Sequence, residues 1–458
     1  MISFDFSNIL RKNIGRESGL SEEFFDNYHE QISEGYKKIE NSRGKSFYSF
    51  MELPYQNLDK LIEYKHKITK FKYFVIVGIG GSSLGAYALF KSIKHHHYNL
   101  VNDKKIFFAD NSDPESLKDI IDAINLEETV FNVITKSGST AETMSGFSYV
   151  FKILKKNNLK IENHIVVTTS KNKGDLFNIA KKYDLDSFFI PEDVGGRYSV
   201  FTPVGLLPAL FLDIDIEQLL NGAKAIDSIW RRKQIENNPI IISSLVNYLY
   251  HVELNRNILA LMCYKDKLES VGSWYQQLWA ESLGKKYDYD NNIIETGSTP
   301  MILRGASDQH SVLQLFMEGP RDKLIVFLDS EKTEINYKFE IDELKEFKSI
   351  EYFDNKTGLD LITSELNGVR YALLKENRPN YTIKVEKMDE YNIGGLLYMF
   401  QLQTVMASIL YRVNPFDQPG VEEGKKATYA LMGRNGYDEK RKEMQENIGT
   451  SYKFKIDE

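Results

Sequence analysis

The 458-residue chain has very little cysteine and no excess of basic side chains. Its one cysteine, Cys263, excludes a framework of internal disulfides and fits a reducing compartment. Acidic residues outnumber Lys and Arg by 65 to 58, which gives a formal charge of −7. A protein dedicated to nucleic acid needs a concentrated basic face, so we expect no nucleic-acid partner.

The chain also lacks segments that direct a protein to a membrane or across it. Its first residues, Met1-Ile-Ser-Phe-Asp5, place an acid where a signal peptide needs a basic start. No apolar run approaches the roughly 20 residues that span a bilayer. With 42% hydrophobic and 27% charged residues, the composition is that of an average globular enzyme, so we expect a cytoplasmic protein with no membrane partner.

Short apolar runs alternate with helical patterns along most of the chain. The runs share the continuous apolar character of strands buried on both faces of a parallel sheet. They lie at residues 74–77, 106–109, 130–134 and 165–168, and again at 257–264, 324–327 and 381–385. This alternation predicts an α/β protein whose parallel sheets are flanked by helices.

The layout divides the chain into four parts. We expect an N-terminal helical segment at 1–55, a first α/β domain at 56–225, a second at 226–412 and a helical C-terminal arm at 413–458. The first part carries no recognisable chemistry.

A glycine-rich turn, Gly78-Ile-Gly-Gly-Ser-Ser-Leu-Gly85, joins an expected strand to a helix. Glycines let the backbone approach a ligand closely, and a helix N-terminus attracts anions. A dinucleotide fingerprint is disfavoured, because Ser83 replaces its third glycine and Asp110 lies 30 residues beyond Gly80 instead of about 20. Taken alone, the turn fits a ligand site or a plain tight turn equally well.

The segment Thr135-Lys-Ser-Gly-Ser-Thr140 follows another expected strand and precedes a helix. Its hydroxyls, its lysine and the helix N-terminus are the groups that bind a phosphomonoester. The alternative is that Ser139 or Thr140 only caps the helix. A single cap does not need so many polar residues, so the segment favours phosphate binding.

Two charged residues stand in suggestive surroundings. Arg197 follows a pair of glycines that would let its guanidinium reach a pocket, although a surface ion pair is the common alternative. Glu281 shares a helical stripe with Trp274 and Leu278, so its carboxylate is predicted to face inward. An inward carboxylate is either functional or the partner of a buried cation.

Two further residues are predicted to face inward on helical spacing. His310 shares a stripe with Leu313 and Met317, where a core histidine that does no chemistry is the alternative. Lys425 lies four residues after Val421, while its neighbours Glu422, Glu423 and Lys426 are expected on the solvated face.

Together these segments resemble the glucose-6-phosphate isomerase (phosphoglucose isomerase) family in its compact bacterial form. Two signatures carry the resemblance. They are Asp193-Val-Gly-Gly-Arg-Tyr-Ser-Val-Phe-Thr-Pro-Val-Gly205 and the stretch from Ser408-Ile-Leu-Tyr to Phe416-Asp-Gln-Pro-Gly-Val-Glu-Glu-Gly-Lys425. The glycine turn, the segment 135–140 and the helix 276–284 match in the same order.

The resemblance implies two sugar-isomerase (SIS) domains and a helical C-terminal arm. It implies reversible isomerisation of D-glucose 6-phosphate and D-fructose 6-phosphate through a cis-enediolate, a step of glycolysis and gluconeogenesis. No cofactor and no metal are implied. It also implies a homodimer in which His310 reaches the site of the partner chain.

The resemblance further implies a role for each site residue. Glu281 is the base that moves a proton between C2 and C1, and Arg197 is the cation that stabilises the enediolate. His310, with Lys425 nearby, opens the sugar ring. The remaining residues bind phosphate or sugar oxygens: Gly81, Ser82, Thr135, Lys136, Ser137, Thr140 and Gln418.

A non-catalytic sugar-phosphate-binding protein of the same fold is the main alternative. Such a protein would keep the segment 135–140 but would have no need of Glu281, Arg197 and His310. An oxidoreductase that uses the glycine turn is disfavoured by the spacing of the glycines and Asp110. The isomerase half of a glucosamine-6-phosphate synthase has the same fold, but such a synthase would carry an extra amidotransferase domain, for which the chain has no room.

Overall fold

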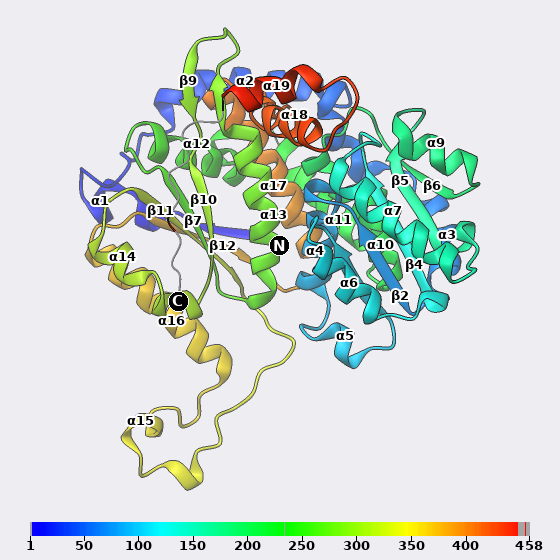
Figure 1. Cartoon of the computed structure of the whole chain (residues 1–458). Coiled ribbons are helices and arrows are strands. Elements are labelled where there is room, and N and C mark those ends of the chain that lie inside the picture. The colour runs from blue at the N-terminus through cyan, green and yellow to red at the C-terminus, as the bar shows by residue number, and fades with distance from the viewer. Residues whose placement is uncertain (1, 233, 448–453, 455–458) are drawn as a thin grey trace.

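The computed structural model describes residues 2–232, 234–447 and 454. Its body consists of two five-stranded sheets side by side, with helices on the faces of each (Figure 1). The first sheet has the order β3-β2-β4-β5-β6 and is parallel throughout. Its strands are β2 (Tyr73–Val77), β3 (Lys105–Ala109), β4 (Thr129–Thr135), β5 (Ile165–Ser170) and β6 (Asp186–Ile190).

The second sheet has the order β1-β12-β11-β7-β10. Its strands are β1 (Ile2–Asp5), β7 (Ile258–Cys263), β10 (Thr299–Arg304), β11 (Lys323–Ser330) and β12 (Asn380–Val385). Only β1 is antiparallel to its neighbour. A small antiparallel pair, β8 (Lys285–Tyr287) and β9 (Ile293–Thr296), stands apart from both sheets.

The parallel strands of the two sheets share one topology, and the antiparallel β1 stands outside it. In each sheet, the chain first forms an inner parallel strand, β2 or β7, and then adds β3 or β10 on one side of it. It then crosses to the other side and adds β4 and β5, or β11 and β12. The connections therefore diverge at the carboxyl ends of β2 and β7, and α/β sheets bind ligands at such switch points.

Most of the expected strands and helices are confirmed, because their sequence patterns are strong. Every residue of β4 and of β11 is buried, as their continuous apolar sequences predict. The sequence patterns missed β6 and β10. Both lie at the edge of a sheet and are only partly buried, so their sequences are less apolar.

Three long helices lie between and against the sheets. They are α11 (Ile216–Arg231), α13 (Asp266–Leu283) and α17 (Glu390–Tyr411). By length and composition α17 passes as a membrane span, which corrects the expectation that no segment comes near it. The helix is buried inside the protein, and a core helix is apolar on all sides for the same reason as a membrane span.

The remaining helices surround the sheets. The α-helices are α1 (Arg11–Ile14), α2 (His29–Ser42), α3 (Asp59–Ile68), α4 (Leu84–Ile93), α5 (Tyr98–Val101), α6 (Pro114–Asp122), α7 (Ala141–Lys156), α8 (Ile161–His164), α9 (Gly174–Lys182), α10 (Pro203–Phe211), α12 (Pro239–Val252), α14 (Leu313–Glu318), α15 (Lys348–Glu351), α16 (Gly358–Lys375), α18 (Glu422–Leu431) and α19 (Asp438–Glu446). The 3-10 turns are η1 (Ser7–Ile9), η2 (Asp26–Tyr28), η3 (Ser46–Tyr55), η4 (Gly80–Ser82), η5 (Leu126–Glu128), η6 (Gly196–Phe201), η7 (Ile235–Asn237), η8 (Ser307–His310), η9 (Asp342–Leu344) and η10 (Pro419–Val421).

The two ends of the chain differ in how well the sequence predicted them. The expected helical segment 1–55 does contain helices, but it opens with β1, whose pairing with β12 adds it to the second sheet. Asp5 at the end of β1 is bound by Arg370 of α16. The expected C-terminal arm contains α18 and α19, and its last part lies outside the described residues.

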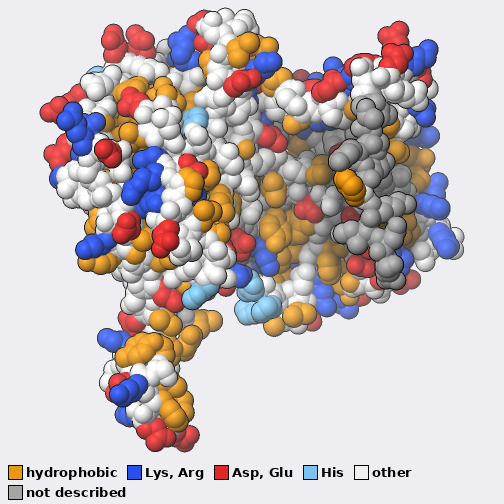
Figure 2. All heavy atoms as spheres, turned by 60° about the vertical axis from the view of Figure 1, so that its left-hand side comes forward, with side chains coloured by type: hydrophobic (Ala, Val, Ile, Leu, Met, Phe, Trp, Pro, Cys, Tyr) orange, Lys and Arg blue, Asp and Glu red, His pale blue; other side chains and the backbone are white. Residues whose placement is uncertain are grey.

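One segment projects far from the body. Residues 331–357, between β11 and α16, extend away from the second sheet and carry α15 at their far end (Figure 1). Hydrophobic side chains gather on this projection (Figure 2). Ile335, Tyr337, Phe347 and Tyr352 are among the large hydrophobic residues that it exposes.

Candidate active site

A cavity of about 510 Å³ lies at the carboxyl ends of β2, β4 and β5. The C-terminal half of α13 and the start of the C-terminal arm complete its walls. It brings together every predicted site residue except His310. The lining residues are Ile79, Gly80, Gly81, Ser82, Thr135, Lys136, Ser137, Thr140, Ser170, Lys173, Gly196, Arg197, Gln277, Glu281, Gln418, Val421 and Lys425.

The glycine turn after β2 forms one wall through close packing of backbones. Gly80 has a φ of +60°, a conformation that favours glycine. A Cβ atom on Gly81 would lie 2.5 Å from the carbonyl oxygen of Gly196 and 2.8 Å from the amide nitrogen of Arg197. The turn is thus pressed against η6, which carries Arg197, so its glycines are needed for packing as well as for access to a ligand.

The segment after β4 forms a cluster of hydroxyl groups. The Oγ1 atoms of Thr135 and Thr140 lie 2.8 Å apart, and the Oγ atom of Ser137 is 3.3 Å from the first and 3.2 Å from the second. Thr140 occupies the N-cap position of α7, yet its side chain makes no capping hydrogen bond there. The alternative that Thr140 serves only as a helix cap is therefore wrong, and its hydroxyl lines the cavity at the positive end of α7.

Two lysines stand beside this cluster. The Nζ atom of Lys136 donates to the carbonyl oxygen of Glu192 at 2.8 Å and lies 5.1 Å from the centre of the Phe47 ring. Burial, and secondly the nearby charge of Lys173, lowers the pKa of Lys136 below its ordinary value. Sequence reasoning missed Lys173 and Ser170. Ser170 ends β5 and Lys173 follows it, and this position is the signal that could have found them, since carboxyl ends of parallel strands meet at one edge.

Glu281 projects from the last turns of α13 and is held on both carboxylate oxygens. Oε2 accepts from Nη1 of Arg197 at 3.2 Å, and Oε1 accepts from Nε2 of Gln277, one turn earlier, at 3.1 Å. The side chain keeps 34% of its surface exposed, which leaves the carboxylate open to the cavity. Gln277 is a site residue that the sequence did not single out, although its spacing of four residues from Glu281 places it on the same helix face.

Arg197 is buried, so the surface ion pair considered as its alternative is excluded. Nε donates to Oγ of Ser282 at 2.8 Å, and Nη1 donates to Oε1 of Gln418 at 2.9 Å in addition to Glu281. Nη2 donates to the carbonyl oxygens of Pro415 and Asp417 at 2.6 and 2.9 Å. The guanidinium therefore fixes the carboxylate of Glu281 and the loop of the C-terminal arm in one geometry.

Two predicted orientations need correction. Lys425 lines the cavity, but its side chain is 48% exposed and pairs with Oε1 of Glu422 at 2.7 Å instead of pointing into a core. His310 ends η8 and is exposed, so it shares no inward stripe with Leu313 and Met317. The stripe failed because Leu313 and Met317 belong to α14, a separate helix that starts three residues later. His310 is not among the residues that line this cavity.

Cys263, at the end of β7, is fully buried, as its apolar surroundings predicted. Burial raises the pKa of its thiol, which makes it a poor nucleophile. Among the described residues, no group of three or more His, Cys, Asp or Glu side chains is placed to hold a metal ion.

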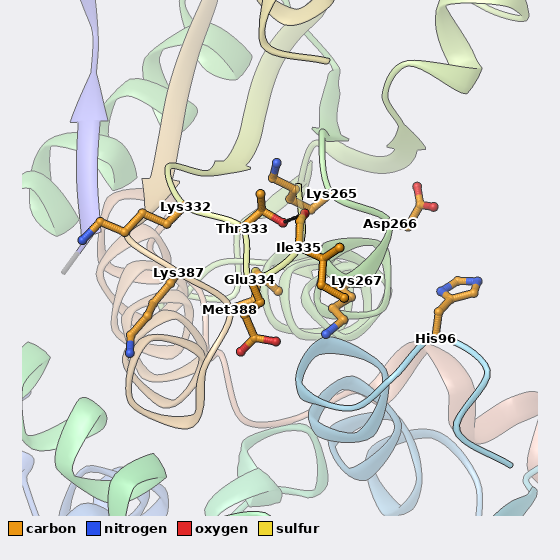
Figure 3. Close-up of a pocket in the computed structure, with 10 residues that line it drawn as sticks. All are labelled: His96, Lys265, Asp266, Lys267, Lys332, Thr333, Glu334, Ile335, Lys387 and Met388. Carbon is orange, nitrogen blue, oxygen red and sulfur yellow. Dashed lines mark hydrogen bonds between the residues drawn. The ribbon is translucent and has the colours of Figure 1, made fainter. Parts of the chain in front are cut away.

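A second cavity, of about 290 Å³, occupies the equivalent edge of the other sheet (Figure 3). Its wall contains Lys265, Lys267, Lys332 and Lys387, which follow the carboxyl ends of β7, β11 and β12. The amino groups of Lys332 and Lys387 point away from the other two (Figure 3). Lys332 pairs with Glu386 at 2.6 Å and Lys387 with Asp389 at 2.7 Å. These lysines do not converge on a common point, so this cavity lacks the concentrated donor set of the first.

The first cavity thus combines a cluster of hydroxyls and lysines with a carboxylate that a buried arginine holds in place. On two parallel sheets flanked by helices, this set of groups fits an enzyme that isomerises a sugar phosphate. The model of the phosphoglucose isomerase family matches residues 63–449, and the chain belongs to that family.

Relatives agree with this assignment, and solved structures share the fold. The chain is 37% identical to the glucose-6-phosphate isomerase of Carboxydothermus hydrogenoformans, over 97% of each chain. It is 35% identical to the probable glucose-6-phosphate isomerase of Methanococcus maripaludis, over 96% of this chain and 97% of the relative. A crystal structure of a hypothetical protein from Thermus thermophilus superposes with a TM-score of 0.82 at 29% identity, covering 94% of this chain and all of that one. A glucose-6-phosphate isomerase structure from Chlamydia trachomatis shares the fold, with a TM-score of 0.80 at 19% identity over 97% and 94% of the two chains.

Proposed function

We propose that this chain interconverts D-glucose 6-phosphate and D-fructose 6-phosphate, with Glu281 as the base. One observation carries the proposal: a single cavity holds both the hydroxyl cluster at 135–140 and the carboxylate of Glu281. A phosphate bound at the first group places the carbons of the sugar chain within reach of the second. The alternative of a non-catalytic sugar-phosphate-binding protein gives no reason for a carboxylate held at both oxygens over that space.

In the proposed reaction, the ring of the bound sugar first opens, with Lys425 and His310 exchanging protons with the ring oxygen and the anomeric hydroxyl. Glu281 then removes the proton from C2 of the open-chain aldose. The electrons of the C–H bond form the C1–C2 double bond while the π electrons of the C1=O bond move onto O1, which gives a cis-enediolate. A proton moves from the O2 hydroxyl to O1, the electrons left on O2 form the C2=O bond, and the C1–C2 π electrons take the proton back from Glu281 at C1, which gives the ketose. The charge of Arg197, buried next to the base, stabilises the negative intermediate.

The other residues hold the substrate. Thr135, Lys136, Ser137 and Thr140 bind the phosphate, which remains remote from the reacting carbons. Gly81 and Ser82 of the glycine turn and Gln418 of the arm contact sugar or phosphate oxygens. The domain division into residues 56–225 and 226–412 is part of this proposal, because the cavity takes its phosphate segment from the first part and its base from the second.

The proposal includes a homodimer in which His310 enters the cavity of the partner subunit. Two observations support it: His310 is exposed and lies outside its own cavity, and residues 331–357 project with hydrophobic side chains that the body does not cover. The buried thiol of Cys263 fits a cytoplasmic location, where thiols stay reduced.

A mixing experiment tests the base and the dimer together. Glu281→Gln and His310→Ala are each expected to abolish conversion of fructose 6-phosphate to glucose 6-phosphate, read by coupled NADP reduction. If His310 acts across the interface, a mixed dimer has one site with both lesions and one intact site. Equal mixing should then restore about a quarter of the wild-type activity, since half of the dimers are mixed. No restoration, with mixed dimers verified by tagged chains, would place His310 in its own site or outside catalysis.

A further inference from the structure

We propose that Lys285 is a positioning residue of the active site, which fixes the backbone of the base and the loop that carries Gln418. The role rests on the site proposed above. Lys285 is the first residue of β8 and follows Gly284, the C-cap residue of α13, and its side chain is only 6% exposed. It was not among the residues that the sequence singled out, because a lysine next to a lysine on a short strand resembles an ordinary surface pair.

The contacts of Lys285 run to both parts of the site. Its Nζ atom donates to the carbonyl oxygen of Glu281 at 2.5 Å, one turn back along α13. The same atom donates to the carbonyl oxygen of Asp417 at 2.9 Å and lies 3.5 Å from the carboxylate of Asp417. A cation at the C-terminal end of a helix is also favoured by the helix dipole.

Lys285 and Arg197 share an acceptor. The carbonyl oxygen of Asp417 receives hydrogen bonds from Nζ of Lys285 and from Nη2 of Arg197, each at 2.9 Å. Arg197 also approaches the carbonyl oxygen of Glu281, at 3.4 Å. Two buried cations thus clamp the same two backbone oxygens. Arg197 alone also reaches the side chains of Glu281 and Gln418, so Lys285 acts through the backbone.

The surroundings of Lys285 make its charge sensitive to pH. Burial, and then the charge of Arg197 on η6, lowers the pKa of Lys285 to about 8. Asp417 from the arm and Glu281 from α13 oppose this shift without cancelling it. As the pH rises through this value, the ammonium of Lys285 loses its proton and its charge, so only Arg197 remains charged at the carbonyl oxygens of Glu281 and Asp417. We therefore expect kcat to fall on the alkaline side of its pH profile.

Substitutions of Lys285 test the role. Lys285→Met keeps the volume of the stem and removes the charge. Loss of a hydrogen-bonded buried charge predicts a fall in kcat of roughly tenfold or more, with a smaller change in KM because the phosphate contacts remain. The fall of kcat near pH 8, which is the alkaline limb of the pH profile, should disappear in this variant. Lys285→Arg, which stays charged, should restore most of the kcat and move the limb to higher pH.

Several outcomes would overturn the role. It fails if Lys285→Met retains wild-type kcat, or if the methionine variant keeps the limb near pH 8. It also fails if kcat in both variants follows the loss of thermal stability, because the residue is then only structural. Glu281→Gln measured in parallel separates this test from the proposed function: an active glutamine variant would refute the base itself, whereas a dead one leaves the result for Lys285 interpretable.

Discussion

The two sheets repeat one topology, yet their equivalent edges differ in chemistry. At the first edge, the segments after β2, β4 and β5 line one cavity with glycines, hydroxyls and lysines. At the second edge, the segments after β7, β11 and β12 also form a cavity, but Lys332 forms an ion pair with Glu386 and Lys387 forms one with Asp389. The fold supplies the crevice twice, and the residues that follow the strands decide whether it becomes a site.

The helix that begins at the second edge explains what the second sheet contributes. The first residue of α13, Asp266, lines the second cavity, and Glu281 near the other end of the helix lines the first. An 18-residue helix is about 27 Å long, which spans the distance between the two edges. The second sheet therefore supports the helix that carries Glu281, the proposed base, to the edge of the first sheet where we propose that the phosphate binds.

The sharpest test of this comparison removes one carboxylate from each cavity. Glu281→Gln should lower kcat by about 10³-fold, within the range for loss of a general base, while KM changes little. Glu334→Gln, in the wall of the second cavity, should leave both constants within about twofold, as expected for an exposed surface change. Steady-state kinetics with fructose 6-phosphate measures both. Equal losses in the two variants would mean that the second edge takes part in catalysis.

The sequence predicted the interior of this architecture better than its borders. Buried strands such as β4 and β11 are continuous apolar runs, so they were found, whereas the edge strands β1 and β10 are only partly buried and carry mixed sequences. The contacts of β1 depend on β12, some 380 residues later, and no local pattern reports such a pairing.

The site shows the same division. Thr135, Ser137 and Thr140 lie in one short segment, so the hypothesis that their hydroxyls act together could be formed before the fold was known. Lys173 and Lys285 join the site only through the folded chain, and neither belongs to a local motif. Gln277 lies on the same helix face as Glu281, but nothing in that spacing showed its contact with the carboxylate. Helical spacing wrongly predicted that His310 faces inward, because the periodicity was carried across the break between η8 and α14. It also wrongly predicted that Lys425 is buried, because the start of the short helix α18 is exposed.

A second test concerns the backbone contact that joins the glycine turn to Arg197. Gly81→Ala places a Cβ 2.4 Å from the carbonyl carbon of Gly196, so η6 must shift and carry Arg197 with it. A displacement of about 1 Å in a catalytic group can cost around 10²-fold in rate, and we expect a loss of that order in kcat/KM. Gly424→Ala on α18 is the matched control, since no atom lies within 4 Å of the added Cβ. Near-UV circular dichroism of both variants is the control that checks that they are folded. Full activity in Gly81→Ala would separate the turn from the position of Arg197.

The smallest expected effect compares one lysine from each edge. Lys136 lies at the hydroxyl cluster that is proposed to bind the phosphate, and Lys332 follows the equivalent strand of the other sheet. Removing a charged hydrogen-bond donor to a dianion should raise KM about tenfold in Lys136→Ala, with kcat nearly unchanged, because the phosphate is remote from the reacting carbons. Lys332→Ala loses only an exposed pair with Glu386, which contributes little, so its KM should stay at the wild-type value.

Competitive inhibition by inorganic phosphate gives a second readout that reports on the binding of phosphate without the sugar: the inhibition constant should rise in Lys136→Ala alone. A parallel rise in both variants would show that phosphate is held at both edges, and the asymmetry between the two sheets would then lie only in the base.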